Sequence, residues 1–440
     1  MGVGFRIMRI VPSITATAIF LSLITASTAR AQYMREDVQD PHRYELGSLA
    51  VPVGYWSNSL KATAGVAGYT EGLFQPQVQE YEFLIGSFNG SYGAVVGLNS
   101  LQLKPIDRLF FDGQIYYFRT QQDENNIAGN PHFPNENAGA NRSGEYDYLQ
   151  SASNDFIGGF TFKYLLPIGD GRERLIDHYT LRDGLLDAGA SGGEGFNPLS
   201  SGRTFLEVTP RFEYMDIRSP YAQRHHWDTT GLQFSAVYDN RDWPLTPSQG
   251  NLTTLALTRD FGIAGSSNPW TNVSAEIAQY IPLGTSSAFR QQVLALDGWT
   301  SYSPTWHQSG TPGHLDVRTG PPFYDGAQLG GMDKMRGFPE NRFHDRAGVY
   351  GAAELRLIPR WNPFQNIPLF KSSDVAWLQF VGFVEVGRVA DEFTFEKLFS
   401  HMKGDAGVGI RVLTQDTVVR IDLAASNEGI QIWANLDQAF

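Results

Sequence analysis

Residues 328–343 of this 440-residue chain, QLGGMDKMRGFPENRF, place an Arg-Gly-Phe tripeptide in the middle of a long insert. The insert runs from about 303 to 346 between two strand-like segments and has prolines at 304, 312, 321, 322 and 339. These prolines exclude a regular helix or a central strand. A loop of this length counts against a compact soluble domain. It is typical of a membrane β-barrel, in which outer loops are long and inner turns are short.

The N-terminus has the features of a secretory signal. Arg6 and Arg9 precede an apolar run over 10–24, and Ala29-Arg30-Ala31 is a small-x-small cleavage sequence. We therefore expect residues 1–31 to be a signal peptide that is cleaved near Ala31. No later stretch approaches the roughly 18 apolar residues of a transmembrane helix, so an exported protein that lies in a membrane would cross it as a closed barrel. The chain has no cysteine, which excludes disulfides and a lipid-anchored N-terminus.

The composition favours many strands over a helical enzyme. Aromatic residues make up 13% of the chain, charged residues only 18%, and there are 46 glycines. This composition suits strands that carry aromatic girdles. A net charge of -12 argues against a nucleic-acid partner. Acidic residues that keep the protein soluble and lie in its loops are sufficient to explain this charge.

Alternation of apolar and polar residues predicts about sixteen strands, each near the ~9–11 residues of a tilted membrane strand. In one of them Val419, Ile421 and Leu423 share a face, and Arg420 and Asp422 lie on the other. Such strands turn an apolar face to lipid and a polar face to a wet lumen, whereas a soluble sandwich rarely points charges into its core. The predicted strands are 43–56, 59–70, 79–88, 91–103, 108–121, 153–167, 203–217, 229–241, 249–262, 271–283, 289–302, 348–359, 376–388, 403–414, 417–426 and 429–440.

Loop lengths predict the orientation of these strands. If the first strand starts in the periplasm, the long polar connections 122–152, 303–347 and 389–402 face outside and short turns such as 282–288 face inside. One inside connection, 168–202, is long. Its residues 172–187 have a partly helix-like pattern and a glycine-rich stretch follows, so we expect a periplasmic plug or collar.

Arg336 carries the most specific chemistry of the insert. Its rigid fork of donors suits carboxylates, and the alternation places Glu354 and Glu385 on the lumen faces of the two strands that follow. Gly337 allows unusual backbone turns, and Phe338 offers an apolar anchor. A loop folded into the lumen would bring Arg336 between the two glutamates. The alternative is a solvated loop arginine and two ordinary lumen glutamates.

From about residue 204 to 440 the chain resembles the bacterial surface-antigen family, the superfamily of the BamA and TamA barrels and the two-partner secretion transporters. LGGMDKMRGF resembles the loop motif of that family, with Met335 where valine or isoleucine is usual. FVEVG and GDAGVGIRVLT resemble its closing strands, with Glu385 where aspartate is usual. YDNRDWPLTPSQG resembles its periplasmic turn through Asp239, Arg241, Asp242, Pro244, Pro247 and Gly250.

The last predicted strand, GIQIWANLDQAF, ends on Phe440 and has apolar residues at alternate positions from Ile430 to Leu436. It resembles the terminal signature of outer-membrane proteins, which the assembly machinery reads as an edge strand. Gln438 departs from that signature, because an apolar residue is usual at this position.

The resemblance implies an all-β fold: a transmembrane antiparallel barrel of about sixteen strands over residues 32–440, with the sixth outer loop inside the lumen. Arg336 would be held there against Glu354 and Glu385. Family members insert or export proteins, often through a weak seam between first and last strands. They usually carry periplasmic POTRA domains ahead of the barrel, and here there is no room for one, so the chain resembles a POTRA-less branch.

These features predict an integral protein of the bacterial outer membrane that inserts or translocates proteins or lipids. Its partners would be outer-membrane lipid, a polypeptide or lipid client, and a separate periplasmic protein in place of the missing domains. The alternative is a passive porin-like channel or surface receptor that keeps the family barrel. We expect no enzyme, cofactor or metal. His225, His226 and Asp228 lack further ligands, and neither a serine–histidine nucleophile arrangement nor a phosphate loop is present.

Overall fold

One large antiparallel sheet dominates the structure, a computed structural model that describes residues 14–15, 33–37, 47–57, 60–189, 192–193, 195–311, 314–363, 375–414 and 417–440. The helical elements with bounds in these ranges are a 3-10 turn, η2 (Gly169–Arg172), and the short helix α1 (Phe395–Phe399). No helix in the described part of the chain is long and apolar enough to span a membrane.

In the main sheet, each strand pairs antiparallel with the next main-sheet strand along the chain. Strand β8 pairs with β11 in the same way, because β9 and β10 belong to another sheet. A further strand, β1 (Ile14–Thr15), pairs in parallel with Ile430 and Gln431 of β24. The strands of the antiparallel series are β3 (Gly47–Ser57), β4 (Lys61–Glu71), β5 (Gln79–Ser87), β6 (Tyr92–Gln102), β7 (Leu109–Asn125), β8 (Leu149–Leu165), β11 (Arg203–Arg218), β12 (His225–Asp239), β13 (Gly250–Asp260), β14 (Trp270–Gly284), β15 (Phe289–Tyr302), β20 (Ala347–Pro359), β21 (Val375–Ala390), β22 (Lys403–Thr414), β23 (Thr417–Ser426) and β24 (Gly429–Leu436).

Each predicted strand overlaps one strand of this series, and the boundaries differ at particular places. Strands β7 and β8 extend beyond their predicted ends, because Glu124 and Asn125 continue the pairing with Gln150 and Leu149. Apart from β1, the predicted signal peptide 1–31 lies outside the described residues.

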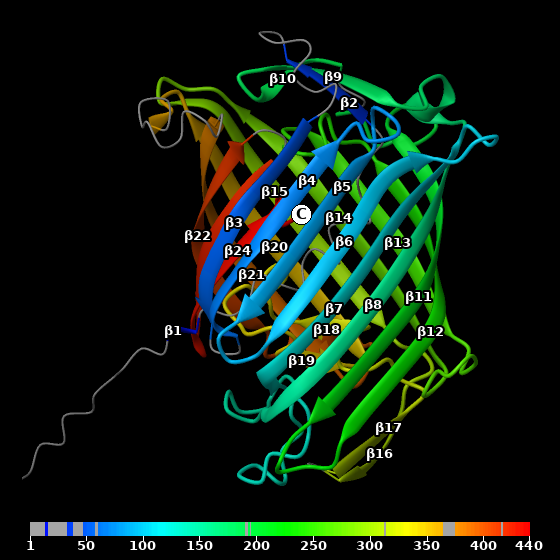
Figure 1. The fold of residues 1–440 in the computed structure, drawn as a ribbon, viewed down its shortest axis with the longest axis vertical. Helices are drawn as coiled ribbons and strands as arrows, with labels where there is room; N and C mark the ends of the chain where they lie inside the picture. The colour runs from blue at the N-terminus through cyan, green and yellow to red at the C-terminus, as the bar shows by residue number, and fades with distance from the viewer. Residues whose placement is uncertain are drawn as a thin grey trace, which may run out of the picture.

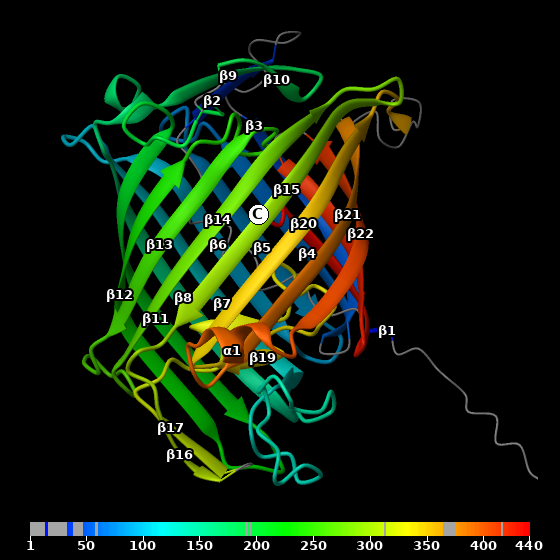
Figure 2. The ribbon, with the colours of Figure 1, turned by 180° about the vertical axis from the view of Figure 1, so that it is seen from behind.

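The predicted end of the last strand is wrong. Strand β24 ends at Leu436, because Asp437 has a φ of 68° and its N–H donates to the carbonyl of Val418 at 2.7 Å. A positive φ interrupts the extended backbone that a strand requires. The C-terminus then turns into the space enclosed by the sheet, where both ribbon views place it (Figures 1 and 2).

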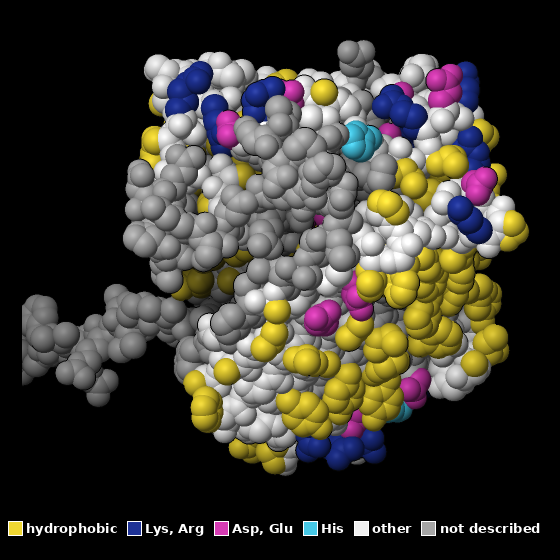
Figure 3. Space-filling model, turned by 45° about the horizontal axis from the view of Figure 1, so that its top comes forward, with side chains coloured by type: hydrophobic (Ala, Val, Ile, Leu, Met, Phe, Trp, Pro, Cys, Tyr) yellow, Lys and Arg dark blue, Asp and Glu magenta, His cyan; other side chains and the backbone are white. Residues whose placement is uncertain are grey.

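The sheet curls about a common axis, with a polar concave face and an apolar convex face (Figures 1 and 2). On β23, Arg420 and Asp422 are fully buried, whereas Ile421 between them is 53% exposed. On β21, Glu385 is buried and its neighbours Val384 and Val386 are about half exposed. Hydrophobic side chains gather over the outer surface (Figure 3). This distribution is the reverse of a soluble protein, in which apolar side chains are inside.

The segment predicted as a plug or collar forms a second, small sheet at one end of the main sheet, seen at the top of Figure 1. The strands are β10 (Leu185–Ala188), β9 (Asp177–Arg182) and β2 (Tyr33–Asp37), in that order. The helix-like interpretation of 172–187 is wrong, because Tyr179 and Leu181 are buried in alternation with His178 and Thr180, which is the period of a strand. We call β2, β9 and β10 with residues 166–202 the cap sheet.

The opposite end of the main sheet carries the long loops, and we call it the loop end (Figure 2). The insert contributes two hairpins there, β16 (His307–Thr311) with β17 (His314–Arg318), and β18 (Ala327–Leu329) with β19 (Phe343–Asp345). Helix α1 lies in the loop that joins β21 to β22. The end that carries the cap sheet and the short turns is called the turn end.

Candidate functional site

Between β18 and β19 the insert folds into the space enclosed by the main sheet. Glycines open the turn, with φ of 104° at Gly330 and 123° at Gly331, values that other residues rarely adopt. Two backbone hydrogen bonds close the turn. The N–H of Gly331 donates to the carbonyl of Phe338 at 3.2 Å, and the N–H of Phe338 donates to the carbonyl of Met335 at 3.0 Å. The turn is therefore a defined structure that presents the tripeptide at its tip.

Apolar packing holds the residues on both sides of Arg336 and Gly337. Met335 and Phe338 are fully buried, and the ring of Phe338 meets that of Phe343 edge-on at 5.1 Å. The same cluster contains Leu329, Phe343, Tyr350, Ala352 and Val389. Burial of two large apolar side chains contributes roughly 1.5–3 kcal/mol each. The free energy of this burial partly offsets the desolvation of the charged Arg336 side chain between them.

Arg336 is fully buried and contacts three carboxylates. Its Nη1 lies 2.8 Å from Oε1 of Glu354 and 2.9 Å from Oδ2 of Asp422, and its Nε lies 3.2 Å from Oε1 of Glu385. Burial alone would lower the pKa of Arg336, but the charges of Glu385, Glu354 and Asp422 raise it well above its ordinary value. The guanidinium is therefore charged at every pH of interest.

The backbone and the ring neighbours of Arg336 complete the contact. Its N–H donates to Oε2 of Glu385 at 2.6 Å, and its carbonyl accepts from Nε1 of Trp433 at 2.6 Å. The guanidinium carbon lies 3.5 Å from the centre of the Phe383 ring, a cation–π geometry. Because these partners come from β20, β21, β23 and β24, one loop residue joins four strands. We call Arg336, Glu354, Glu385 and Asp422 the clamp.

Gly337 allows the insert to approach the sheet closely. A Cβ at this position would lie 2.5 Å from Cβ of Asp405 and 3.0 Å from Cβ of Ser426. The carbonyl of Gly337 accepts from Oγ of Ser426 at 2.7 Å. Any larger residue would push the tip of the insert away from β22 and β23.

Further arginines surround the clamp and balance its charge. Glu354 also contacts Arg356 at 2.7 Å and Arg411 at 3.0 Å, and Asp333 of the insert contacts Arg420 at 3.0 Å. With Arg336, these arginines pair with the buried carboxylates of Glu354, Glu385 and Asp422 and with Asp333 of the insert. Buried charges of this kind are tolerated when they are paired.

The insert is also attached on its other sides. Nζ of Lys334 lies 2.8 Å from Oε1 of Glu276 on β14, across the enclosed space. Nε of Arg342 lies 2.6 Å from Oε2 of Glu428, and its Nη2 donates to the carbonyl of Ser143 at 2.8 Å. The insert is therefore fixed to strands on opposite sides of the sheet and to the loop 126–148.

The sequence identified Arg336, Glu354 and Glu385 as candidates, and the structure brings them together. It missed Asp422, although the alternation of β23 places this residue on the polar face. Three strands, β20, β21 and β22, lie between the insert and β23, so no local sequence pattern links Asp422 to Arg336. Gly409 is the available signal: a Cβ there would lie 2.1 Å from Oδ1 of Asp422, so the glycine on β22 leaves room for the carboxylate.

The residues of the periplasmic-turn motif lie together at the turn end, far from the clamp along the strands. Nε and Nη2 of Arg241 donate to the two oxygens of Asp239 at 2.9 and 2.8 Å. Oδ1 of Asp242 accepts from the N–H groups of Trp243 and Ser248, both at 2.9 Å. Pro244, Pro247 and Gly250 lie in the same turn between β12 and β13.

This turn supports the cap sheet. Trp243 and Leu245 of the turn pack in one cluster with Tyr179, Leu181 and Trp377. Nε1 of Trp377 donates to the carbonyl of Gly184 at 2.8 Å. The motif is thus a structural turn that seats the cap sheet on the end of the main sheet.

Phe440 lies in the space enclosed by the main sheet. Its carbonyl accepts from Nη2 of Arg356 at 3.2 Å, and its ring centre lies 4.9 Å from the Arg356 guanidinium. Its role as a terminal assembly signal stays a prediction, since the signal acts before folding.

The histidine pair at the start of β12 is arranged as ordinary loop-end side chains. Nε2 of His226 lies 2.6 Å from Oδ2 of Asp228, and the ring of His225 stacks on Trp227 at 5.6 Å. Across the described ranges, no group of three or more His, Cys, Asp or Glu side chains is arranged to hold a metal ion.

Three similar solved structures share little sequence identity with this chain. The chain is similar to BamA from Haemophilus ducreyi lacking POTRA domains 1–3, with 12% identity and a TM-score of 0.49, covering 90% of this chain and 70% of that one. It is similar to CdiB from Acinetobacter baumannii, with 11% identity and a TM-score of 0.48, covering 88% and 58%. It is similar to CdiB from Escherichia coli, with 9% identity and a TM-score of 0.49, covering 88% and 61%.

No curated protein matches the chain significantly. The Omp85 superfamily domain matches residues 203–431, more than half of the chain, and this range holds the insert, the clamp and the periplasmic-turn motif. The chain therefore belongs to the Omp85 superfamily.

Proposed function

We propose that the chain is an outer-membrane barrel that inserts or translocates a polypeptide or a lipid without covalent chemistry. The main sheet would close into about sixteen strands, with β3 beside β24, and the cleaved signal peptide would direct export. The Omp85 match supports the membrane location, because members such as BamA and CdiB are bacterial outer-membrane proteins. The apolar convex face supports it independently, since it suits contact with lipid.

The observation that carries the proposal is the clamp. Arg336 contacts residues of β20, β21, β23 and β24, which are the strands next to the last edge of the sheet. A brace at that place keeps these strands fixed relative to the insert while the neighbouring edge, between β24 and β3, stays a weaker seam. In this account the clamp is structural, and the client passes or inserts at the seam.

The orientation follows from the two ends. The loop end would face the cell exterior and the turn end the periplasm, where the cap sheet would meet a separate periplasmic partner. The polar, clamp-filled interior leaves a cavity of about 500 Å³ beside the insert.

The test is a quantitative profile of outer-membrane proteins and lipids in cells depleted of this protein and complemented with wild type or Arg336→Ala. We expect particular proteins or lipids to be lost on depletion and to be restored only by wild type. A profile that does not change on depletion would overturn the assembly role.

A passive channel is the second candidate, because the interior is lined by polar side chains. The insert and the cap sheet argue against it, since both lie across the axis. Conductance of the purified protein in a planar bilayer distinguishes the two. A steady, solute-sized conductance that survives Arg336→Ala would favour the channel.

A further inference from the structure

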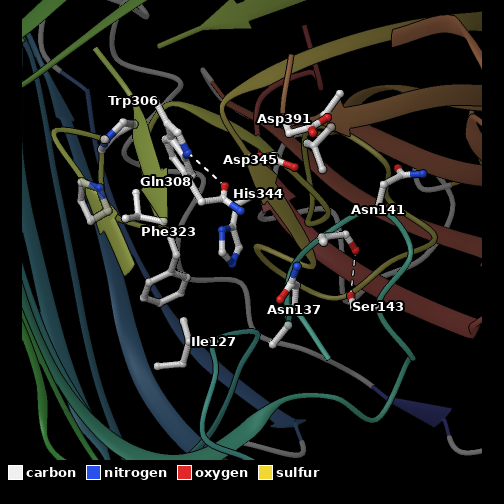
Figure 4. Close-up of a pocket in the computed structure, with 18 of the residues that line it drawn as sticks. Ile127, Asn137, Asn141, Ser143, Trp306, Gln308, Phe323, His344, Asp345 and Asp391 are labelled. Atoms are coloured by element: carbon white, nitrogen blue, oxygen red, sulfur yellow. Dashed lines mark hydrogen bonds between the residues drawn. The ribbon is translucent and has the colours of Figure 1, made fainter. Parts of the chain in front are cut away.

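A large cavity opens at the loop end, apart from the clamp. Its volume is about 1360 Å³, above the roughly 300–1,000 Å³ of a typical small-molecule pocket. Its walls come from five segments: 127–144, the start of β12, residues 267–270, the insert, and residues 388–401, which include the end of β21 and α1. Figure 4 shows side chains of 127–143, the insert and Asp391 around a common space. Neither the clamp nor the proposed transport step uses this cavity.

One wall of the cavity is aromatic, and its rings are held in place. Trp306, Trp227 and Phe323 line it, and the rings of Trp227 and Phe323 lie 5.5 Å apart. Nε1 of Trp306 donates to Oε1 of Gln308 at 3.3 Å (Figure 4). A Cβ on Gly320 would lie 2.5 Å from the Trp306 ring, so the backbone packs against the indole. Rings fixed in advance cost little conformational entropy when a ligand stacks on them.

The opposite wall is polar and contains unused hydrogen-bonding atoms. Asn141 is 7% exposed; its Nδ2 donates to the carbonyl of His401 at 3.1 Å, but its Oδ1 has no hydrogen-bond partner. Arg388 is 6% exposed; Nη1 donates to Oγ of Ser400 at 2.7 Å, and Nε has no partner. Asn137 and Asn141 lie across the space from Trp306 and Phe323 (Figure 4). A buried polar atom without a partner costs about 1–3 kcal/mol, and a ligand hydroxyl would remove that cost.

The charge of the walls limits the ligand class. Seven carboxylates line the cavity against three cationic side chains, an excess of four negative charges. This field repels acidic polymers. The carboxylates are Glu136, Asp228, Asp325, Asp345, Asp391, Glu392 and Glu396, and the cations are Arg142, Arg388 and Lys397.

We propose that this cavity binds a neutral oligosaccharide. A sugar ring has an apolar C–H face, which fits on a fixed indole, and a rim of hydroxyls, which fits amide and guanidinium groups that both accept and donate. The volume accommodates several sugar units in a row. A quaternary ammonium ligand would instead need rings on several sides, and here the rings form one wall.

The test is isothermal titration calorimetry of the purified full chain in detergent. The probes are a panel of neutral hexose and N-acetylhexosamine oligosaccharides, hyaluronan oligosaccharides of matching length, and choline. We expect one or more neutral classes to bind with a Kd below about 1 mM and little dependence on salt. Trp306→Ala should weaken binding about tenfold through lost stacking. Asn141→Ala should weaken it severalfold.

Trp361→Ala is the matched control, because Trp361 is 57% exposed and follows β20 at the turn end. Binding should be unchanged in this variant. Trp306→Phe, which keeps a ring, should retain part of the affinity and guards against a folding defect. Three results would overturn the proposal: no neutral oligosaccharide binds, hyaluronan or choline binds more tightly than every neutral probe, or Trp306→Ala and Asn141→Ala bind as wild type does.

Discussion

The insert and the cap sheet cover opposite ends of the main sheet, and they differ in how ion pairs and apolar packing attach them. At the loop end the insert is held by Arg336, whose guanidinium contacts carboxylates on β20, β21 and β23. At the turn end the cap sheet combines packing of Tyr179 and Leu181 in an apolar cluster with one buried ion pair, in which Nη1 of Arg203 on β11 lies 2.8 Å from Oδ2 of Asp177 on β9. The insert has one arginine shared among three carboxylates, whereas the cap sheet has a single ion pair beside its apolar cluster.

The difference teaches what each attachment specifies. An ion-paired arginine fixes one position, because removing either partner leaves uncompensated buried charge. An apolar cluster tolerates small shifts, because burial depends on area and has no direction. The insert is therefore suited to hold the strands near the last edge in register.

The largest effect should come from Arg336→Ala. The substitution leaves Glu354, Glu385 and Asp422 without their shared cation, so the free energy of unfolding should fall by about 3–5 kcal/mol. Unfolding in denaturant and protease resistance of the insert measure it. The control is Arg318→Ala, because Arg318 is exposed and pairs with Asp316 on the surface. Wild-type stability in Arg336→Ala would remove the clamp from the account.

Trp377→Ala should weaken the attachment of the cap sheet at the turn end. Loss of the fully buried indole, with its hydrogen bond to Gly184, should cost about 3 kcal/mol. Hydrogen exchange should increase in β9 and β10 and stay unchanged in the insert, because the two attachments are separate. Trp361→Ala serves as the control at the same end. Equal loss of protection in both segments would show that the ends are coupled.

Gly337→Ala should have a smaller effect, confined to the loop end. The added Cβ would lie 2.5 Å from Cβ of Asp405, and overpacking of this kind costs about 1–3 kcal/mol. Gly382→Ala on β21 is the control, because a Cβ there meets nothing within 4 Å. If the two variants have the same unfolding midpoint, the close approach of the insert to β22 is not required.

The smallest effect should be a pH dependence of the insert. Burial, together with the charges of Asp333 and Asp123, raises the pKa of Glu340 to about 8. The unfolded value is about 4.3, so the folded chain binds the extra proton between these two values. Stability of the insert is therefore highest below about pH 4.3 and falls as the pH rises to about 8.

Glu340→Gln replaces the titrating carboxyl group by a neutral amide of similar size, so the pH dependence due to Glu340 should disappear. Wild type should become easier to cleave within 303–346 as the pH rises from 6 to 9, and Glu340→Gln should show a flatter dependence. Glu396→Gln is the control, because Glu396 is exposed on α1. Identical pH profiles for wild type and Glu340→Gln would contradict the raised pKa.

Much of the fold could be predicted because its signals are local. Alternation such as Arg420 and Asp422 against Ile421 gives each strand and its polar face without reference to any other strand. The tripeptide around Arg336, with Glu354 and Glu385 on the next two strands, gave part of the clamp for the same reason. The six residues of the turn motif lie within a single connection.

Features that depend on distant contacts could not be predicted. Asp422 joins the clamp through the register of three strands, and only the absence of a side chain at Gly409 indicates the space. Within 172–187, β9 is a strand because it pairs with β2, about 140 positions earlier in the chain. The last strand stops at Leu436 because Asp437 adopts a positive φ, a conformation that the alternating pattern does not reveal.

The most direct test of the central claim is a double-mutant cycle between Arg336 and Glu385, measured as the free energy of unfolding. The four proteins are wild type, Arg336→Ala, Glu385→Gln and the double variant. The account predicts a coupling energy of about 1–3 kcal/mol, because the two side chains contact each other in a fully buried site. Additivity within about 0.3–0.5 kcal/mol would contradict it and would mean that the insert is held by its apolar packing alone.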